Sequence, residues 1–341
     1  IEYRAARSFF DNTRMQESIA PSVHVQGSED LRDIVRREVA AVLGHTDPTA
    51  IDTERGFFDI GLDSLTIVQL KTRLEESLGL TLPSTLGLEY PSIEALTAHI
   101  KSLMATTPGA ITAPRAVAAS RSGDEPIAIV GIGCRFPGGA SDPESFWNVL
   151  RDRVDAVRPF PAHRWRDVPP FSADADEPGT IATRMGGFLD HIDQFDADFF
   201  RLSAREASSL DPQHRLLLQV AWDALEDAGS VYARSAGARV GVFAGVSASD
   251  YARRLTTPDA YYATGNALNA APGRISYLFG FRGPSIAIDT ACSSSLVAIR
   301  LACQSLRSGE CDAALAGGVN LILSMETTQS LSRAKVLSPE G

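Results

Sequence analysis

Residues 286–296 read Ile-Ala-Ile-Asp-Thr-Ala-Cys-Ser-Ser-Ser-Leu, and this stretch decides the fold of the larger part of the chain. Apolar, β-favouring residues lead into small and polar ones, and apolar residues then recur at helical spacing as far as Leu306. The pattern predicts a strand that turns sharply into a helix, with Cys292 at the bend. The N-terminus of a helix presents free N–H groups and the positive end of the dipole, which favour a thiolate. Cys292 is therefore a candidate nucleophile.

The same residues allow a second interpretation, in which Cys292 is buried between strand and helix and the serines are helix caps. The length of the motif favours the first interpretation. Residues 289–295, Asp-Thr-Ala-Cys-Ser-Ser-Ser, resemble the active-site signature of β-ketoacyl synthases, in particular the ketosynthase domains of modular type I polyketide synthases. The resemblance implies that Cys292 is the catalytic residue that accepts an acyl chain. A cysteine at this position, where some relatives have glutamine, favours condensation over decarboxylation alone.

Three more apolar runs predict further buried strands, at residues 126–133, 240–246 and 311–320. Helical patterns separate these runs, and strands that alternate with helices predict an α/β layered domain. The glycines of the first run do not predict a dinucleotide site, because Phe136 stands where that fingerprint has its third glycine. The resemblance implies the thiolase-like fold, with residues 124–341 as its N-terminal half only.

Residues 28–105 predict a separate, small all-α bundle of three to four short helices. Apolar residues recur at helical spacing over about 31–43, 64–78 and 91–103. Gly44 and Gly79 follow the first two patterns as stop signals. Residues 29–105 hold 13 acidic and 7 basic residues, so most of the chain's net charge of -10 lies here. An acidic bundle suits docking on a basic enzyme surface, although a solvated surface explains the charge equally well.

Asp63 and Ser64 stand at the predicted start of the second helix, where their ordinary role is helix capping. However, residues 56–65, Gly-Phe-Phe-Asp-Ile-Gly-Leu-Asp-Ser-Leu, resemble the phosphopantetheine attachment site of acyl carrier proteins, as do residues 82–85 and 90–93. The resemblance implies a four-helix carrier domain in which Ser64 binds the cofactor 4'-phosphopantetheine through a phosphodiester. A hydroxyl at a helix N-terminus suits this role, because the helix dipole favours a phosphate there.

The remaining segments and the composition complete the domain organisation. Residues 1–27 are weakly patterned and do not begin with Met, so we interpret them as the tail of an upstream domain or as a linker in a longer polypeptide. Residues 106–123 are rich in small residues and contain two prolines, which predicts a flexible linker. The four cysteines lack C-x-x-C spacing, which predicts no metal site and favours a reducing cytoplasm. The acidic charge argues against nucleic acid and anionic membranes as partners.

The family's mechanism also needs two histidines and a lysine, but no histidine follows His214. His214 lies early on its predicted helix beside Arg215, and we interpret it as structural. We therefore expect this span to be inactive alone.

The resemblance implies part of a polyketide synthase assembly line, in which Cys292 takes an acyl chain from a carrier thiol. Decarboxylative Claisen condensation with a malonyl-type extender follows. Implied partners are acyl and malonyl-type thioesters, a phosphopantetheinyl transferase, other synthase domains or subunits, and a second copy in a homodimer. Two alternatives stay open: a non-catalytic carrier and interaction fragment, and a non-elongating ketosynthase that only transfers the chain.

Overall fold

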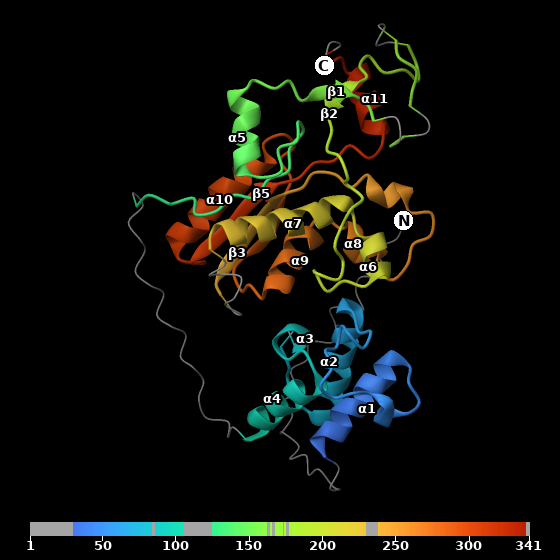
Figure 1. Cartoon of the computed structure of the whole chain (residues 1–341), viewed down its shortest axis with the longest axis vertical. Coiled ribbons are helices and arrows are strands. Elements are labelled where there is room, and N and C mark those ends of the chain that lie inside the picture. Colours follow the sequence, from blue (N-terminus) through green and yellow to red (C-terminus); the bar gives the residue numbers. More distant parts are fainter. Residues whose placement is uncertain are drawn as a thin grey trace, which may run out of the picture.

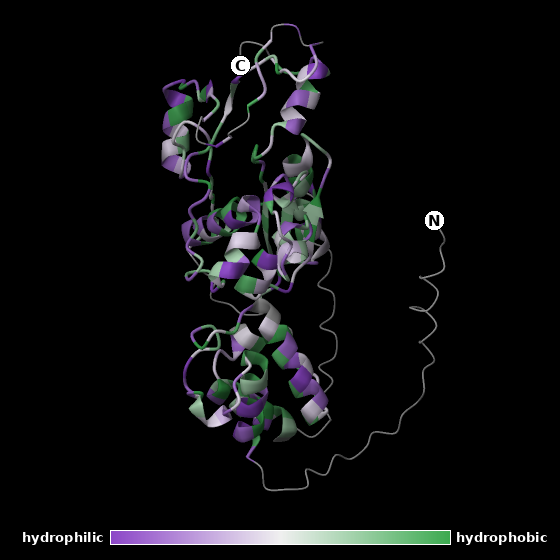
Figure 2. Cartoon of the chain, turned by 90° about the vertical axis from the view of Figure 1, so that its right-hand side faces the viewer, coloured by the Kyte–Doolittle hydropathy of each residue, from purple (hydrophilic) through white to green (hydrophobic). Residues whose placement is uncertain are grey.

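The computed structural model describes residues 30–83, 86–105, 125–161, 164–165, 168–172, 174, 177–229 and 238–338. These residues form two folded parts, a helical bundle (residues 30–105) and an α/β part (residues 125–338), which lie one beyond the other along the long axis (Figures 1 and 2). The tail predicted at residues 1–27 and the linker predicted at 106–123 lie outside the described residues.

The helices and strands of the described residues are, in chain order, α1 (Leu31–Leu43), η1 (Pro48–Ala50), α2 (Ser64–Leu78), α3 (Leu86–Glu89), α4 (Ile93–Ala105), α5 (Pro143–Arg151), β1 (Val157–Pro159), β2 (Met185–Gly187), α6 (Ala204–Ser209), α7 (Pro212–Asp227), β3 (Val240–Gly245), η2 (Tyr251–Arg254), α8 (Tyr262–Asn266), α9 (Ala270–Phe279), β4 (Ser285–Ile288), α10 (Ser294–Ser308), β5 (Ala313–Gly318) and α11 (Glu326–Arg333).

Helices α1 and α2 begin and end where the sequence predicts, whereas α4 begins and ends two residues later than predicted. At the start of α1 the carboxylate of Asp30 accepts a hydrogen bond of 3.2 Å from the backbone N–H of Arg32. Gly44 ends the helix with φ +74°, and Gly79 ends α2 with φ +63°, a left-handed conformation that favours glycine. These caps satisfy backbone groups that the helix itself leaves unpaired.

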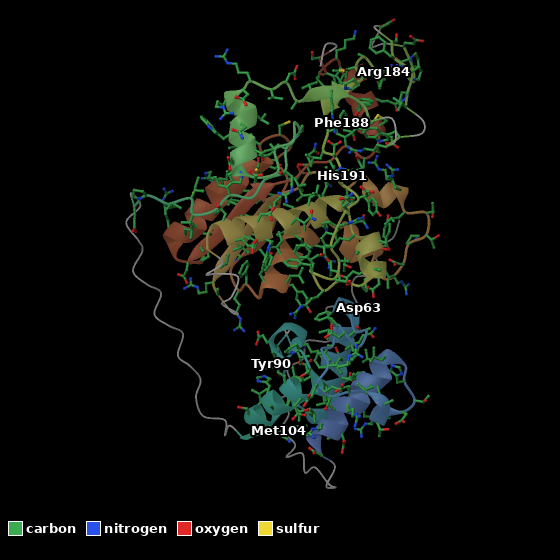
Figure 3. All side chains as sticks on the ribbon, viewed as in Figure 1. Asp63, Tyr90, Met104, Arg184, Phe188 and His191 are labelled. Atoms are coloured by element: carbon green, nitrogen blue, oxygen red, sulfur yellow. The ribbon has the colours of Figure 1, made fainter. Side chains whose placement is uncertain are left out.

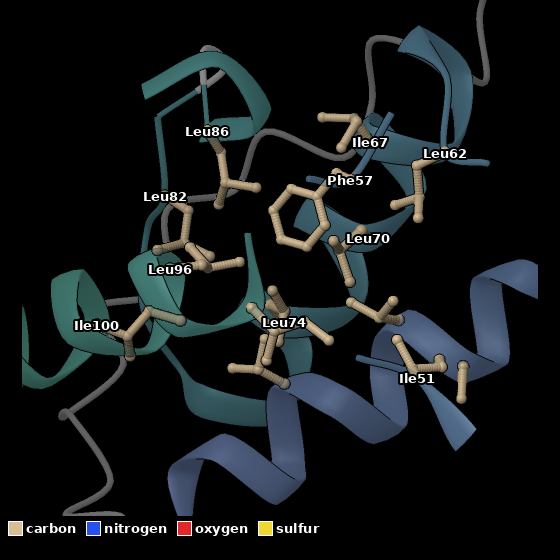
Figure 4. Packing of buried hydrophobic residues seen from close by; sticks show 14 residues of the cluster. Ile51, Phe57, Leu62, Ile67, Leu70, Leu74, Leu82, Leu86, Leu96 and Ile100 are labelled. Atoms are coloured by element: carbon tan, nitrogen blue, oxygen red, sulfur yellow. The ribbon is translucent and has the colours of Figure 1, made fainter. Parts of the chain in front are cut away.

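The bundle closes around one hydrophobic core. Fourteen buried side chains form it, and Phe57 lies at its centre between α2, α3 and α4 (Figure 4). Phe57, Leu74 and Leu96 are completely buried. Each such side chain contributes about 1.5–3 kcal/mol relative to an exposed one. The bundle therefore has a core of its own.

The sheet of the α/β part has three parallel strands in the order β4-β3-β5. Its central strand, β3, is buried along its whole length. Alternate residues point to opposite faces, because Val242 packs with α7 and α9 whereas Phe243 packs with α10. The predicted α/β layering is thus confirmed, with α9 and α7 on one face and α10 on the other (Figure 1). The carboxyl ends of all three strands meet at the edge that carries the turn to Cys292.

The buried strand predicted at residues 126–133 is wrong. The described residues of this run pair with no strand, and Ile129 and Val130 are 83% and 63% exposed. The run lies against α7 through its glycines, since a Cβ at Gly131 or Gly133 would clash with backbone carbonyl oxygens of α7. An apolar run predicts burial only where a partner covers its other side.

The described helices are short, and the longest, α7, has 16 residues. A bilayer span needs about 20. No helix of the described residues has the length and apolar character to cross a bilayer. Nor do the described residues gather three or more His, Cys, Asp or Glu side chains that could hold a metal ion.

Candidate functional site

Cys292 lies on a tight turn between β4 and α10, as the sequence predicts. The turn spans Asp289 to Ser293, and α10 begins at Ser294. Ala291 has φ +53°, a left-handed conformation that is rare for a residue with a Cβ. The carboxylate of Asp289 supports it by accepting a hydrogen bond of 3.0 Å from the backbone N–H of Ala291. A strained backbone held in this way is typical of functional sites.

The hydroxyl of Ser294 connects both sides of this turn. Its oxygen accepts a hydrogen bond of 2.9 Å from the backbone N–H of Thr290 and donates one of 2.6 Å to the carbonyl of Ala291. The Ser247 hydroxyl, which follows β3, lies 3.2 Å away. Because the single hydrogen of Ser294 is already donated, Ser247 is the donor in that contact. Ser294 thus fixes the turn that carries Cys292 to the end of the central strand.

The turn also needs two glycines on the neighbouring strands. A Cβ at Gly245 would lie 2.9 Å from the backbone carbonyl carbon of Ser294, closer than real structures allow. A Cβ at Gly318 would lie 3.1 Å from both the carbonyl oxygen of Gly245 and the side chain of Ser295. The start of α10 therefore packs directly on the backbone of β3, and a larger residue at position 245 would displace it.

Among the four cysteines, which all lie in the described residues, Cys292 alone is exposed. Burial raises the pKa of the Cys134 thiol. The buried Cys311 thiol donates to the hydroxyl of Ser305 at 3.3 Å. The alternative of a buried, structural Cys292 is therefore wrong. The capping role of the serines is not observed either, since the Ser293 hydroxyl instead donates to Thr290 within the turn.

His214 is buried inside the α/β part, where neither ring nitrogen has a hydrogen-bond partner among the described residues. Burial, and secondarily the positive charge of Arg274, lowers its pKa to about 4. Arg274 itself forms a buried ion pair of 2.6 Å with Glu206. A neutral ring without access to solvent fits the structural role predicted for His214.

Ser64, the second candidate, is the first residue of α2. The carboxylate of Asp63 caps this helix, accepting a hydrogen bond of 2.9 Å from the backbone N–H of Thr66, and the Thr66 hydroxyl accepts one from the backbone N–H of Asp63. A phosphate ester at position 64 would lie at the positive end of a 15-residue helix. The residues present therefore fit a phosphopantetheine group.

Two residues at this end of the bundle contact the α/β part. The Tyr261 hydroxyl donates a hydrogen bond to Asp63, and Arg282 lies 3.2 Å from the carboxylate of Glu89. The sequence pattern does not point to Tyr261 or Arg282, and it includes Ser294 only as one of the serines of residues 289–295. Tyr261 and Asp63 are 198 positions apart, and a contact over this distance leaves no local pattern in the sequence. The run of serines after Cys292 does indicate Ser294, but the second interpretation of the motif treats these serines as helix caps.

The structure thus combines an exposed cysteine on a strand–turn–helix, as expected of an acyl-accepting cysteine, with a helical bundle that has a serine at a capped helix start, as expected of a carrier. The family comparisons agree. Residues 124–341 match the β-ketoacyl synthase N-terminal domain, and residues 33–100 match the phosphopantetheine attachment site. The chain therefore belongs to the β-ketoacyl synthase family, and the predicted phosphopantetheine site is confirmed at the level of the domain.

The similar curated proteins are polyketide synthases. The chain is 46% identical over 317 residues to polyketide synthase GfsB of Streptomyces halstedii, covering 91% of the chain and 6% of that protein. It is 42% identical over 340 residues to the pikromycin polyketide synthase component PikAII of Streptomyces venezuelae, covering 97% of the chain and 9% of that protein. The chain thus spans less than a tenth of the length of these relatives.

Solved structures with a similar fold are ketosynthases. The ketosynthase from module 6 of the bacillaene synthase of Bacillus subtilis is 39% identical, with a TM-score of 0.54 over 63% of this chain and 35% of that one. An oxazolomycin ketosynthase domain from Streptomyces albus is 36% identical, with the same TM-score over 62% of this chain and 37% of that one. The predicted combination of a carrier bundle with a thiolase-like α/β fold is therefore confirmed.

Proposed function

We propose that this chain is a carrier domain followed by the N-terminal portion of a ketosynthase in a polyketide synthase assembly line. The carrier spans residues 28–105 and the ketosynthase portion residues 124–341, a division supported by the two family matches. Cys292 accepts the acyl chain, and Ser64 is the attachment residue. The observation that supports the proposal most strongly is that Cys292 is exposed on a turn held by the hydrogen bonds of Ser294.

The acyl step follows from the geometry of this turn. The Cys292 thiolate attacks the carbonyl of an acyl thioester, the carbon–sulfur bond of that thioester breaks, and its thiol leaves with a proton. Small neighbours such as Ala291 and Ser293 leave the sulfur accessible. Phosphopantetheine, when bound at Ser64, supplies a thiol on a long arm that holds the acyl chain as a thioester.

Condensation needs more than these residues provide. In the family, histidines help the malonyl-type extender lose CO₂ and stabilise the resulting enolate, which then attacks the acyl carbonyl and releases the cysteine. No histidine follows His214 in the chain. Residues 1–341 alone are therefore proposed to be inactive in condensation, and the one step proposed for them is the loading of an acyl chain on Cys292.

The further partners follow from the same family. A phosphopantetheinyl transferase modifies Ser64, other domains or subunits of the synthase exchange acyl chains with it, and a second copy pairs through the ketosynthase portion in the cytoplasm. The exposed apolar side chains of α10 support an additional contact on that helix, since Leu296 is 71% exposed and Ile299 46%.

Acyl loading tests the proposal directly. We expect the full chain, incubated with an acyl thioester of N-acetylcysteamine, to gain one acyl group that peptide mass spectrometry places on Cys292. Cys292→Ala removes the gain, whereas the control Cys303→Ala, on the helix α10 that follows the turn, keeps it. Acylation of Cys303 at the same rate as Cys292 would mean that the turn confers no special reactivity.

A second candidate is a carrier and interaction fragment without any acyl transfer. The family matches and the polyketide synthase relatives do not favour it. The loading experiment separates the two, since such a fragment leaves Cys292 unacylated while Ser64 still accepts phosphopantetheine.

A further inference from the structure

The helical bundle contacts the α/β part through the end that carries its attachment site. Figure 3 places Asp63 at the end of the bundle facing the α/β part and Met104 at the opposite end. Two side-chain contacts join the parts here, Tyr261 with Asp63 and Arg282 with Glu89. We call Tyr261 and Arg282 the docking pair.

Tyr261 is held in place by the α/β part itself. Its backbone N–H donates 2.9 Å to the carboxylate of Asp259, and its carbonyl accepts 2.7 Å from the backbone N–H of Gly265. The guanidinium of Arg205 lies 5.9 Å from the centre of its ring, and Arg205 pairs with Asp259 at 3.5 Å. The ring is thus oriented before the bundle arrives, which lowers the entropic cost of docking.

The hydroxyl of Tyr261 stays a donor over the working pH range. Burial, and secondarily the hydrogen bond to Asp63, raises its pKa above the ordinary value. A protonated phenol beside a carboxylate forms a charge-assisted hydrogen bond, which is stronger than a neutral one.

The two carboxylate oxygens of Asp63 accept hydrogen bonds from two different parts of the chain. Oδ1 accepts from the backbone N–H of Thr66 and so caps α2, whereas Oδ2 accepts from Tyr261. With both oxygens engaged, Asp63 is only 8% exposed. The residue directly before Ser64 is therefore nearly buried and is in contact with the α/β part.

The second contact joins the end of α3 to the residues after α9. The backbone of Arg282 is fixed, because its N–H donates 2.9 Å to the carbonyl of Ala238. Its side chain is 61% exposed, whereas that of Glu89 is 20% exposed. An exposed ion pair adds little affinity, and its role is to orient the acidic bundle.

We propose that the docking pair holds the bundle of the same chain by its attachment end and thereby withholds Ser64 from the phosphopantetheinyl transferase. The proposal rests on the proposed function of Ser64. The α/β part and the transferase then compete for one end of the bundle, so modification requires undocking. Because only the undocked bundle can be modified, the modification rate is proportional to the undocked population.

The test is the rate at which the full apo chain gains phosphopantetheine from coenzyme A with a broad-specificity transferase, followed by intact mass. We expect Tyr261→Phe, which removes only the hydroxyl, to speed modification roughly tenfold, as loss of a hydrogen bond to a charged group predicts. Arg282→Glu places like charges together and speeds it about threefold. Tyr262→Phe, whose hydroxyl contacts Ala252 within the α/β part, is the matched control and keeps the wild-type rate.

A second readout does not depend on modification. NMR relaxation of the bundle amides reports whether the bundle tumbles with the whole 36.5 kDa chain or as a small independent domain. Docking predicts slow tumbling in the wild type and fast tumbling in Tyr261→Phe combined with Arg282→Glu.

The outcomes are distinct. Equal rates with independent tumbling in the wild type overturn the docking proposal. A rate difference that grows with protein concentration assigns docking to a second copy and overturns the same-chain arrangement. If no variant gains mass while the wild-type bundle tumbles slowly, the carrier function of Ser64 fails and the docking contact stands.

Discussion

The helical bundle and the α/β part differ in how completely they bury their apolar side chains. Within the described bundle, Val68, Leu103 and Met104 are the large apolar side chains that stay exposed. The α/β part exposes many more. They include Ile129, Val130, Phe136, Trp147, Leu150, Phe171, Phe199, Leu296, Ile299 and Val336. The bundle buries its apolar side chains in a core of its own, whereas the described α/β part leaves many large apolar side chains exposed to solvent.

This difference matches the two proposed tasks. A carrier moves between partners and must be stable by itself, which the closed core around Phe57 provides. A condensing site is built from several segments, and under the proposed function the α/β part contributes Cys292 and its turn as one of them.

The core of the bundle gives the largest effect. Leu74 is completely buried, and Leu74→Ala should lower the free energy of unfolding of the bundle by about 2–5 kcal/mol. Leu296→Ala in the α/β part is the matched control, because that side chain is 71% exposed, and should cost less than about 0.5 kcal/mol. Amide hydrogen exchange measures both, since it reports each part separately. Equal losses would contradict the contrast.

The buried His214 gives the α/β part a pH dependence that comes from a single buried ring. Its pKa of about 4 in the folded chain is below the ordinary value of about 6.5. Between these values the unfolded chain binds the proton and the folded chain does not, so stability falls as the pH drops. The loss approaches about 3 kcal/mol at pH 4.

Denaturant unfolding at pH 7 and pH 4.5 measures this loss, which His214→Gln should abolish. Burial raises the pKa of Asp211, which acts in the opposite direction, so the difference between variant and wild type isolates His214. His191→Gln, at an exposed histidine, is the control. A wild-type pH dependence in His214→Gln would show that the buried ring is not its source.

The hydrogen bonds of Ser294 across the turn have a smaller effect on stability and a specific effect on the reactivity of Cys292. Ser294→Ala removes the acceptor of the Thr290 N–H and the donor to Ala291, at a cost of about 1–3 kcal/mol. Displacement of the turn should slow iodoacetamide alkylation of Cys292 about tenfold. Ser295→Ala, one residue further along α10, should leave the rate unchanged. Equal rates in wild type and Ser294→Ala would show that Ser294 does not position Cys292.

Local pattern sufficed for helices α1 and α2 and for the positions of both candidate residues. The limits of α1 and α2 follow from Asp30, Asp63 and the glycines that end them, because capping is decided by neighbouring residues. The turn at Cys292 was predictable for the same reason, since a change of period from strand to helix is visible in the sequence.

Features that depend on distant partners were not predictable. The run at residues 126–133 has the composition of a buried strand, but nothing in it shows which segment would cover Ile129. The partners of Ser294 lie on the turn and at Ser247, 47 residues away. The contact of Tyr261 with Asp63 joins two separately folded parts, so it depends on tertiary packing alone.

If one chain joins a carrier to a ketosynthase portion, Ser64 must accept phosphopantetheine. The measurement is the intact mass after extended incubation with coenzyme A and a phosphopantetheinyl transferase. We predict that the wild type and the control Ser102→Ala, on the exposed side of α4, gain one phosphopantetheine, whereas Ser64→Ala gains none. No gain in a wild-type chain whose bundle is folded would leave Asp63 and Ser64 as a helix cap and contradict the account.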